Sequence, residues 1–288
     1  ITMPDPHLLI HRPIGRTGLT TPALSFGAAP LGTLSYLNSV DSDAEAVEAI
    51  RHALDAGISL FDTAPSYGEG TSERRLGLAL SGVPRDRFVL ETKVVSRMAD
   101  VLPDYSRNGV LRSLAESLDR LRLDRIDIAL MHDPEQRYRE ALDVVYPVLA
   151  ELRRAGALRA IGVGMMNQWR TLMDFARDGD FDCFLLAGRY HLLEQDALPF
   201  LDLCHERGIA VLLGAVSLAT GSTLTIPIVP STKTAAGDVQ AIAVNAATIS
   251  GSLATQIRSV TAAFRDPANA SVTLGAVACV AGARKFAT

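Results

Sequence analysis

Short apolar runs alternate with longer amphipathic stretches along most of this chain, and this alternation is the strongest constraint on its fold. Apolar runs of about four to eight residues are typical of buried strands, whereas apolar residues recurring every three or four positions are typical of helices. The expected strands span residues 22–26, 58–61, 88–92, 126–131, 160–164, 183–187 and 209–213. The expected helices span about 43–55, 72–81, 107–121, 138–155, 167–177, 194–206 and, with a weaker pattern, 236–264.

The regular order of strand and helix predicts parallel strands joined by right-handed helical crossovers. Gly57 and Gly208 each follow an expected helix and precede the next strand, as helix-ending glycines do. Seven strand–helix units, with an eighth expected near the carboxyl end, favour a closed (β/α)8 TIM barrel over an open doubly wound sheet. No G-x-G-x-x-G motif follows the first strand, which argues against a Rossmann domain. We therefore expect an α/β protein with a single barrel domain, residues 1–288.

The composition excludes several classes of partner. The 288 residues carry a net charge of −4 and no long run of lysine or arginine, so we expect no nucleic-acid surface. No apolar stretch has the length and flanks of a membrane span or signal peptide, so we expect no membrane partner. Cys183, Cys204 and Cys279 are isolated and lack metal-ligand spacing, which predicts free thiols, no metal and a cytoplasmic location. The sequence does not define an oligomeric state.

Four polar residues follow the ends of expected strands and are the main candidates for a catalytic site. Asp62 and Tyr67 follow the second strand, Lys93 the third and His132 the fourth. In a parallel barrel the carboxyl ends of the strands meet on one face, which carries the active site. A carboxylate, a phenol, an amine and an imidazole brought together there can move a proton at a carbonyl or hydroxyl oxygen.

Each of these side chains has another ordinary interpretation when it is taken alone. Asp62 with the following threonine suits a loop or helix cap, and Tyr67 suits a half-buried packing position. Lys93 suits an exposed strand end, and His132 a hydrogen-bonded position in the core. Their shared placement at successive strand ends favours one common site.

Several motifs resemble those of the aldo-keto reductases. The resemblance covers about residues 10–213, and within the family it points to the branch that oxidises aldoses such as L-fucose, or pyridoxal. The motifs that carry it are Gly15-Arg-Thr-Gly-Leu19, Phe61-Asp-Thr-Ala-Pro-Ser-Tyr-Gly68 with Ser72-Glu73, Glu91-Thr-Lys93, Met131-His-Asp-Pro134, Ile161-Gly-Val-Gly-Met-Met-Asn167 and Leu186-Ala-Gly-Arg-Tyr190.

The resemblance implies an oxidoreductase that transfers hydride between NADP or NAD and a small sugar or aldehyde. Tyr67 would be the acid/base, and the Lys93 ammonium would lower the phenol pKa from its usual value of about 10. Asp62 would hold Lys93, and His132 would orient the reacting oxygen.

The resemblance also implies a set of cofactor-binding residues. Asn167 matches one member of the polar pair that binds the nicotinamide amide in the family. Gly27 and Ala28 would allow the cofactor and the substrate to approach the backbone closely. Arg284 would be a partner for a 2′-phosphate. The expected set is Gly27, Ala28, Asp62, Met166, Asn167, Gly188, Gly214, Ser217, Leu218, Gly275, Ala276 and Arg284.

From about Gly214 onward the sequence departs from the family. Residues 214–288 contain no tyrosine or tryptophan. Residues 266–276 fit the family's last strand and the Gly-Ala turn that binds phosphate. Residues 278–284 offer a second possible alignment with the same turn, in which Gly-Ala is followed by Arg284. The final barrel helix is expected to be missing.

Two other functions fit parts of this pattern. Lys93 suits a Schiff-base lyase on the same barrel. A non-enzymatic regulatory subunit that binds nicotinamide would also resemble channel-associated members of the family.

Overall fold

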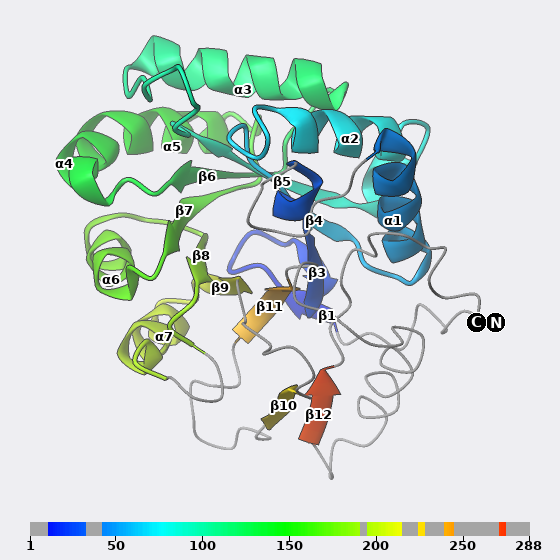
Figure 1. Cartoon of the computed structure of the whole chain (residues 1–288). Helices are drawn as coiled ribbons and strands as arrows, with labels where there is room; N and C mark the ends of the chain where they lie inside the picture. Colours follow the sequence, from blue (N-terminus) through cyan, green and yellow to red (C-terminus); the bar gives the residue numbers. More distant parts are fainter. Residues whose placement is uncertain are drawn as a thin grey trace.

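A computed structural model describes residues 11–32, 42–190 and 195–214, together with the backbone of three short strands at 224–227, 239–244 and 271–274. Eight parallel strands form a closed barrel with helices packed around it (Figure 1). This confirms the predicted (β/α)8 fold. In barrel order the strands are β11 (Val239–Val244), β3 (Leu24–Gly27), β4 (Leu60–Asp62), β5 (Val89–Val94), β6 (Ile128–His132), β7 (Ala160–Met166), β8 (Cys183–Ala187) and β9 (Ala210–Gly214).

The helices between these strands follow the predicted ranges closely. Ser42 caps the first helix by accepting a hydrogen bond from the Glu45 backbone, and Ser106 caps the third in the same way. The helix expected at 138–155 is interrupted by a π-helical segment, Ala141–Val145. The helices are α1 (Asp43–Asp55), α2 (Thr71–Leu80), α3 (Arg107–Leu121), α4 (Tyr138–Glu140), α5 (Tyr146–Arg154), α6 (Trp169–Asp178) and α7 (Leu198–Glu206).

Two predictions for the carboxyl-terminal part are wrong. Residues 239–244 were expected to lie in a helix, but they form β11, which pairs in parallel with both β9 and β3 and closes the barrel. Residues 271–274 were expected within the last barrel strand, but they form β12, which pairs antiparallel with β10 (Leu224–Pro227) in a separate two-stranded sheet. The run Val-Gln-Ala-Ile-Ala-Val at 239–244 contains three β-branched residues, which favour a strand over a helix.

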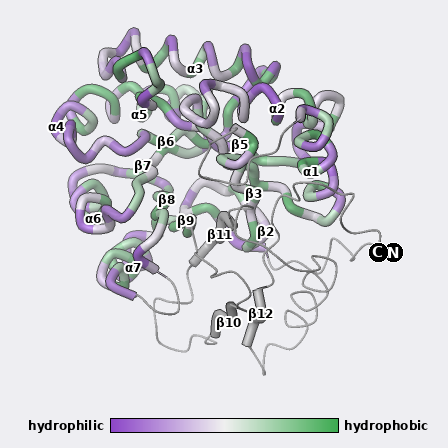
Figure 2. Tube along the Cα trace, in the orientation of Figure 1, coloured by the Kyte–Doolittle hydropathy of each residue, from purple (hydrophilic) through white to green (hydrophobic). Residues whose placement is uncertain are grey.

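Apolar side chains fill the barrel interior at the end where the strands begin. Leu60, Val89 and Ile128 stand at or near the starts of their strands and belong to one buried cluster. A hairpin of β1 (His11–Pro13) and β2 (Thr20–Pro22) adds Ile14 and Leu19 to this cluster. A second, larger cluster lies between strands and helices, and the helices in Figure 2 combine hydrophobic and hydrophilic positions accordingly. Polar groups inside the barrel therefore gather toward the carboxyl ends of the strands.

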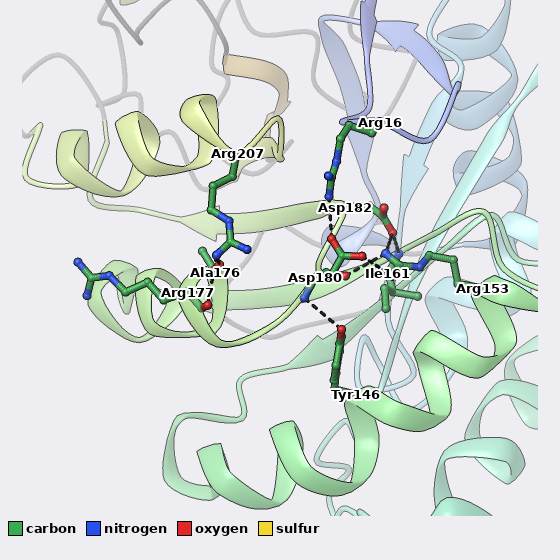
Figure 3. Close-up of polar contacts among 9 residues, drawn as sticks. All are labelled: Arg16, Tyr146, Arg153, Ile161, Ala176, Arg177, Asp180, Asp182 and Arg207. Carbon is green, nitrogen blue, oxygen red and sulfur yellow. Dashed lines mark hydrogen bonds and ion pairs between the residues drawn. The ribbon is translucent and has the colours of Figure 1, made fainter.

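Ion pairs attach the hairpin to the segment that leads into β8 (Figure 3). Arg16 donates to Asp180 over 2.7 Å, and Arg153 donates to both Asp180 and Asp182. Asp182 also accepts from the backbone of Ile161 at the start of β7. This network fixes the amino-terminal end of the barrel, opposite the strand ends that carry the candidate site.

In the described part of the chain no helix is long and apolar enough to cross a membrane. Cys183 and Cys204 are buried free thiols, and Cys279 lies outside the described residues.

Candidate active site

Asp62 and Lys93 form a buried ion pair at the carboxyl ends of β4 and β5. Lys93 is 1% exposed, and its Nζ donates to Asp62 Oδ1 and to the backbone oxygen of Thr63, the latter over 2.8 Å. Burial alone would lower the pKa of Lys93, but the Asp62 carboxylate raises it above its usual range. Lys93 is therefore an ammonium group held at a fixed place inside the barrel.

Tyr67 reaches the same point from the loop between β4 and α2. The Lys93 Nζ lies 5.0 Å from the centroid of its ring. The loop packs directly on the turn at Ala29–Gly32: a Cβ added to Gly68 would stand 1.7 Å from the Gly32 oxygen, and Gly68 has a φ of +63°. Only glycine fits both the contact and the backbone angle, so this pair of glycines sets the position of Tyr67.

The net pKa shift of Tyr67 is opposite in direction to the one predicted from the effect of Lys93. Burial raises the pKa of the phenol above its usual range, and Lys93 lowers it only in part. The predicted direction of the lysine effect is present, but the cost of placing a phenolate in a dry interior is larger. In the resting protein Tyr67 is therefore a neutral phenol with a proton to donate.

His132 is the last residue of β6 and presents a neutral imidazole to Tyr67. The two rings meet edge to face, with centroids 5.9 Å apart and planes at 85°. Burial, followed by the Lys93 charge, lowers the pKa of His132 to about 3. Its Nδ1 lies 2.8 Å from Ser96 Oγ and 3.4 Å from Ser66 Oγ, so these contacts occupy Nδ1 and fix the ring.

The predicted cofactor residues that the structure describes lie on the same rim of the barrel. The Asn167 backbone donates to Ala187, and the Gly188 backbone donates to Gly214, so the ends of β7, β8 and β9 are contiguous. A Cβ on Gly188 would stand 2.3 Å from Asn167 Oδ1, so the amide lies against bare backbone. Met166 is 57% exposed at the end of β7. The Asn167 side chain at this rim carries the donor and acceptor groups that match the carboxamide of a nicotinamide.

The other described cofactor residues adjoin the ion pair. Gly27 is the register partner of Asp62 on the neighbouring strand, and the Ala28 backbone N–H donates to the backbone carbonyl oxygen of Asp62 over 2.8 Å. Ser72 Oγ donates to the Ala28 oxygen over 2.7 Å and fixes this turn from α2. The remaining predicted residues, Ser217, Leu218, Gly275, Ala276 and Arg284, lie outside the described residues.

Sequence reasoning missed three polar residues at this site. Ser66 and Ser96 contact His132 from two loops, and no spacing rule indicates such contacts. Glu91 lies inside the barrel beside Asp62, and its signal was available: it precedes Lys93 by two residues, and alternate residues of a strand share a face.

Strained backbone accompanies the strand ends at this rim. Four non-glycine residues just beyond consecutive strands have a positive φ: Val95 (+52°), Asp133 (+45°), Asn167 (+61°) and Arg189 (+63°). Such conformations cost about 1–3 kcal/mol each and cluster at functional sites. The strain therefore marks the same end of the barrel as the polar side chains.

Within the described ranges, no three histidine, cysteine or acidic side chains are grouped so that they could hold a metal ion. The polar groups that the structure brings together at this rim are a buried ion pair, a phenol and an imidazole.

Comparison with known proteins agrees with this geometry. The model of the Aldo/keto reductase family matches residues 23–235. D-threo-aldose 1-dehydrogenase from Pseudomonas sp is 38% identical over 69% of this chain and 67% of its own length. Pyridoxal 4-dehydrogenase from Microbacterium luteolum is 36% identical over 71% of this chain and 70% of its own length.

A solved structure gives the same result. The crystal structure of an aldo-keto reductase from Pseudomonas aeruginosa superposes with a TM-score of 0.61 at 33% identity, covering 71% of this chain and 77% of that one. On the sequence match and on the shared barrel, the chain belongs to the aldo/keto reductase family.

Proposed function

We propose that this protein is an NAD(P)-dependent oxidoreductase that interconverts an aldose at C1, or a similar alcohol or aldehyde. The observation that carries the proposal is the buried Lys93–Asp62 pair beside Tyr67, with His132 at the edge of the phenol ring. The similarity to an aldose dehydrogenase and a pyridoxal dehydrogenase supports this substrate class.

Tyr67 exchanges the proton at the reacting oxygen. In carbonyl reduction the neutral phenol donates its proton as the oxygen gains charge. In alcohol oxidation Tyr67 first releases its own proton to solvent, and the resulting phenolate, which the Lys93 ammonium stabilises, accepts the proton of the alcohol. Asp62 keeps the ammonium in place in both directions.

His132 orients the substrate oxygen. Ser96 and Ser66 lie at Nδ1, and Nε2, which is 3.7 Å from Asp133 Oδ2, is the ring atom that we assign to the reacting oxygen. Because the imidazole is neutral, it does not compete with Tyr67 as a proton donor.

The bound nicotinamide cofactor supplies or accepts the hydride. Asn167 would bind its amide group, and Gly188 and Gly214 would leave space for the ring. Met166, with Gly27 and Ala28 on the opposite side of the rim, would border it. Ser217, Leu218, Gly275 and Ala276 remain proposed contacts from the sequence, and Arg284 is the proposed determinant of NADP over NAD.

The state of Lys93 disfavours the lyase alternative. A Schiff base forms from a neutral amine, whereas the Asp62 carboxylate raises the pKa of Lys93 and keeps it charged. Its Nζ is also bound to Asp62 and Thr63.

The test is a panel of aldoses and pyridoxal offered with NAD and with NADP, followed by the absorbance of the reduced cofactor. We expect turnover with at least one sugar or pyridoxal, and a loss of at least about 100-fold in kcat for Tyr67→Phe with cofactor affinity retained. Full activity in Tyr67→Phe would contradict the assignment. Cofactor binding without turnover of any panel member would favour the regulatory alternative, and borohydride trapping of substrate on Lys93 would favour the lyase.

We further propose a single domain and a cytoplasmic location. The buried free thiols of Cys183 and Cys204 suit a reducing compartment.

A further inference from the structure

Glu91 is a fully buried acidic residue that the proposed chemistry does not use. It lies in β5 with 0% exposure, and its Cα pairs with Asp62 on β4 and with Ile128 on β6. It stands two residues before Lys93, so both side chains leave the same face of the strand, toward the barrel interior. Glu91 therefore lies beside Asp62 in the sheet and one inward-facing position before Lys93.

The surroundings of Glu91 do not suit an ionised carboxylate. Neither of its two oxygens accepts a hydrogen bond within the part of the chain that the structure describes. The nearest ammonium, that of Lys93, donates to Asp62 and to the backbone of Thr63 instead. A carboxylate buried without donors is very costly, whereas a carboxylic acid brings a donor of its own.

The neighbouring charges lead to the same conclusion. Among the described residues, the ionisable groups that face Glu91 are Asp62 from β4, Tyr67 from the loop after β4, Lys93 from β5 and Cys183 from β8. One ammonium cannot neutralise two adjacent carboxylates, so one of them keeps its proton. Burial and then the Asp62 charge raise the pKa of Glu91 well above its usual range, although Lys93 opposes them.

We propose that Glu91 is a neutral carboxylic acid whose O–H donates to the Asp62 carboxylate, and that it is a positioning residue for the Asp62–Lys93 pair. Asp62 then accepts from Lys93 on one side and from Glu91 on the other, which fixes its orientation. Asp62, Lys93 and Glu91 together then carry one carboxylate and one ammonium and no net charge. This inference concerns the catalytic site of the proposed oxidoreductase and rests on that function.

The protonation of Glu91 has a consequence for the chemistry. An ionised Glu91 raises the pKa of both Tyr67 and Lys93. Tyr67 would then hold its proton more firmly, so less phenolate would be present to accept the proton of the alcohol. A neutral Glu91 therefore keeps Tyr67 effective as a proton acceptor. When Glu91 loses its proton at high pH, alcohol oxidation slows.

Infrared spectroscopy of the resting protein tests the protonation state without any turnover. We expect wild type at neutral pH to show the C=O stretch of a protonated carboxylic acid, shifted in D2O and absent in Glu91→Gln. Glu116→Gln is the matched control, because Glu116 is an exposed glutamate on α3 and its replacement leaves the band in place. A spectrum in which Glu91→Gln removes no protonated-acid band overturns the proposal, whether or not a substrate has been found.

Kinetics then test the positioning role. Glu91→Gln keeps a neutral donor for Asp62, whereas Glu91→Met has similar bulk and no donor. We expect kcat for oxidation to fall about 10-fold or more in Glu91→Met and to be largely rescued in Glu91→Gln. The Gln variant should also lose the fall in oxidation rate that wild type shows when Glu91 ionises at high pH.

Equal activity losses in the Gln and Met variants, with a wild-type pH profile in both, would overturn the positioning role. If Glu91→Met does not fold, the pH profile of Glu91→Gln against wild type decides the matter. If no panel substrate turns over, the proposed function fails, and the infrared result still decides the state of Glu91.

Discussion

The Nζ of Lys93 donates to the carboxylate of Asp62 inside the barrel, where both side chains are almost completely buried. A buried ion pair of this kind adds little net stability, because each charge has lost its water. Removing one member is costly, since the other charge then stays buried without compensation. The pair therefore couples the stability of this end of the barrel to its chemistry.

Single replacements of this pair should lower stability, and the double replacement should restore it. We expect Lys93→Met or Asp62→Asn to lower the free energy of unfolding by about 3–5 kcal/mol. Asp62→Asn/Lys93→Met should recover most of that loss while its kcat remains at least about 100-fold reduced, because the double variant has neither the stranded charge nor the ammonium. Urea denaturation and turnover measure the two quantities. Additive losses of stability in the double variant would contradict this interpretation.

His132 should make the protein less stable in mild acid. Its pKa is about 3 in the folded protein against 6.5 for the ordinary side chain. Between these values the unfolded state binds more protons, so the free energy of unfolding falls as the pH falls. We expect His132→Asn to remove about 1–2 kcal/mol of the loss between pH 7 and pH 5, as measured by denaturant titration. The same pH slope in wild type and variant would show that His132 titrates in the folded protein as it does in the unfolded chain.

Gly68→Ala should displace Tyr67. The added Cβ would meet the Gly32 oxygen, so the loop must move, and kcat should fall at least about 10-fold together with a loss of about 1–3 kcal/mol in stability. Gly82→Ala is the matched control, because Gly82 has a φ of +76° with nothing within 4 Å of an added Cβ. It should show only the backbone cost, about 1 kcal/mol, and unchanged kcat. Equal kcat in the two variants would argue against the packing of Gly68 on Gly32 as the determinant of the Tyr67 position.

Arg284→Ala should weaken the binding of NADP but not that of NAD. If Arg284 binds a 2′-phosphate, its removal should weaken NADP binding about 10-fold or more and leave NAD binding within about twofold. Fluorescence titration with each cofactor measures both dissociation constants. An equal effect on the two cofactors would assign Arg284 a role unrelated to the 2′-phosphate.

The sequence predicts most of the barrel and the convergence of its four polar residues, for identifiable reasons. Asp62, Lys93 and His132 each end an apolar run, and parallel strands bring such positions to one rim. The carboxyl-terminal elements are predicted wrongly for two reasons: the β-branched residues of 239–244 outweigh the weak helical pattern of 236–264, and pattern alone does not reveal which strand pairs with both β9 and β3.

Protonation states could not be predicted from the sequence. The direction of the Tyr67 pKa shift depends on whether the cost of burial exceeds the benefit from Lys93, and that requires coordinates. The absence of donors around Glu91 among the described residues is likewise a three-dimensional property, although its strand position was visible in the sequence.

The hairpin that carries Ile14, Leu19 and Arg16 has a consequence for how this protein can change. Its apolar contacts and ion pairs fix the fold at the end where the strands begin, while the reacting groups stand at the opposite end. Substitutions in the rim loops can therefore alter which substrate is accepted at little cost to folding, and substitutions in the hairpin should alter heat resistance with little effect on substrate choice. Directed evolution of new specificity is best confined to the rim, with the hairpin as the place to add robustness beforehand.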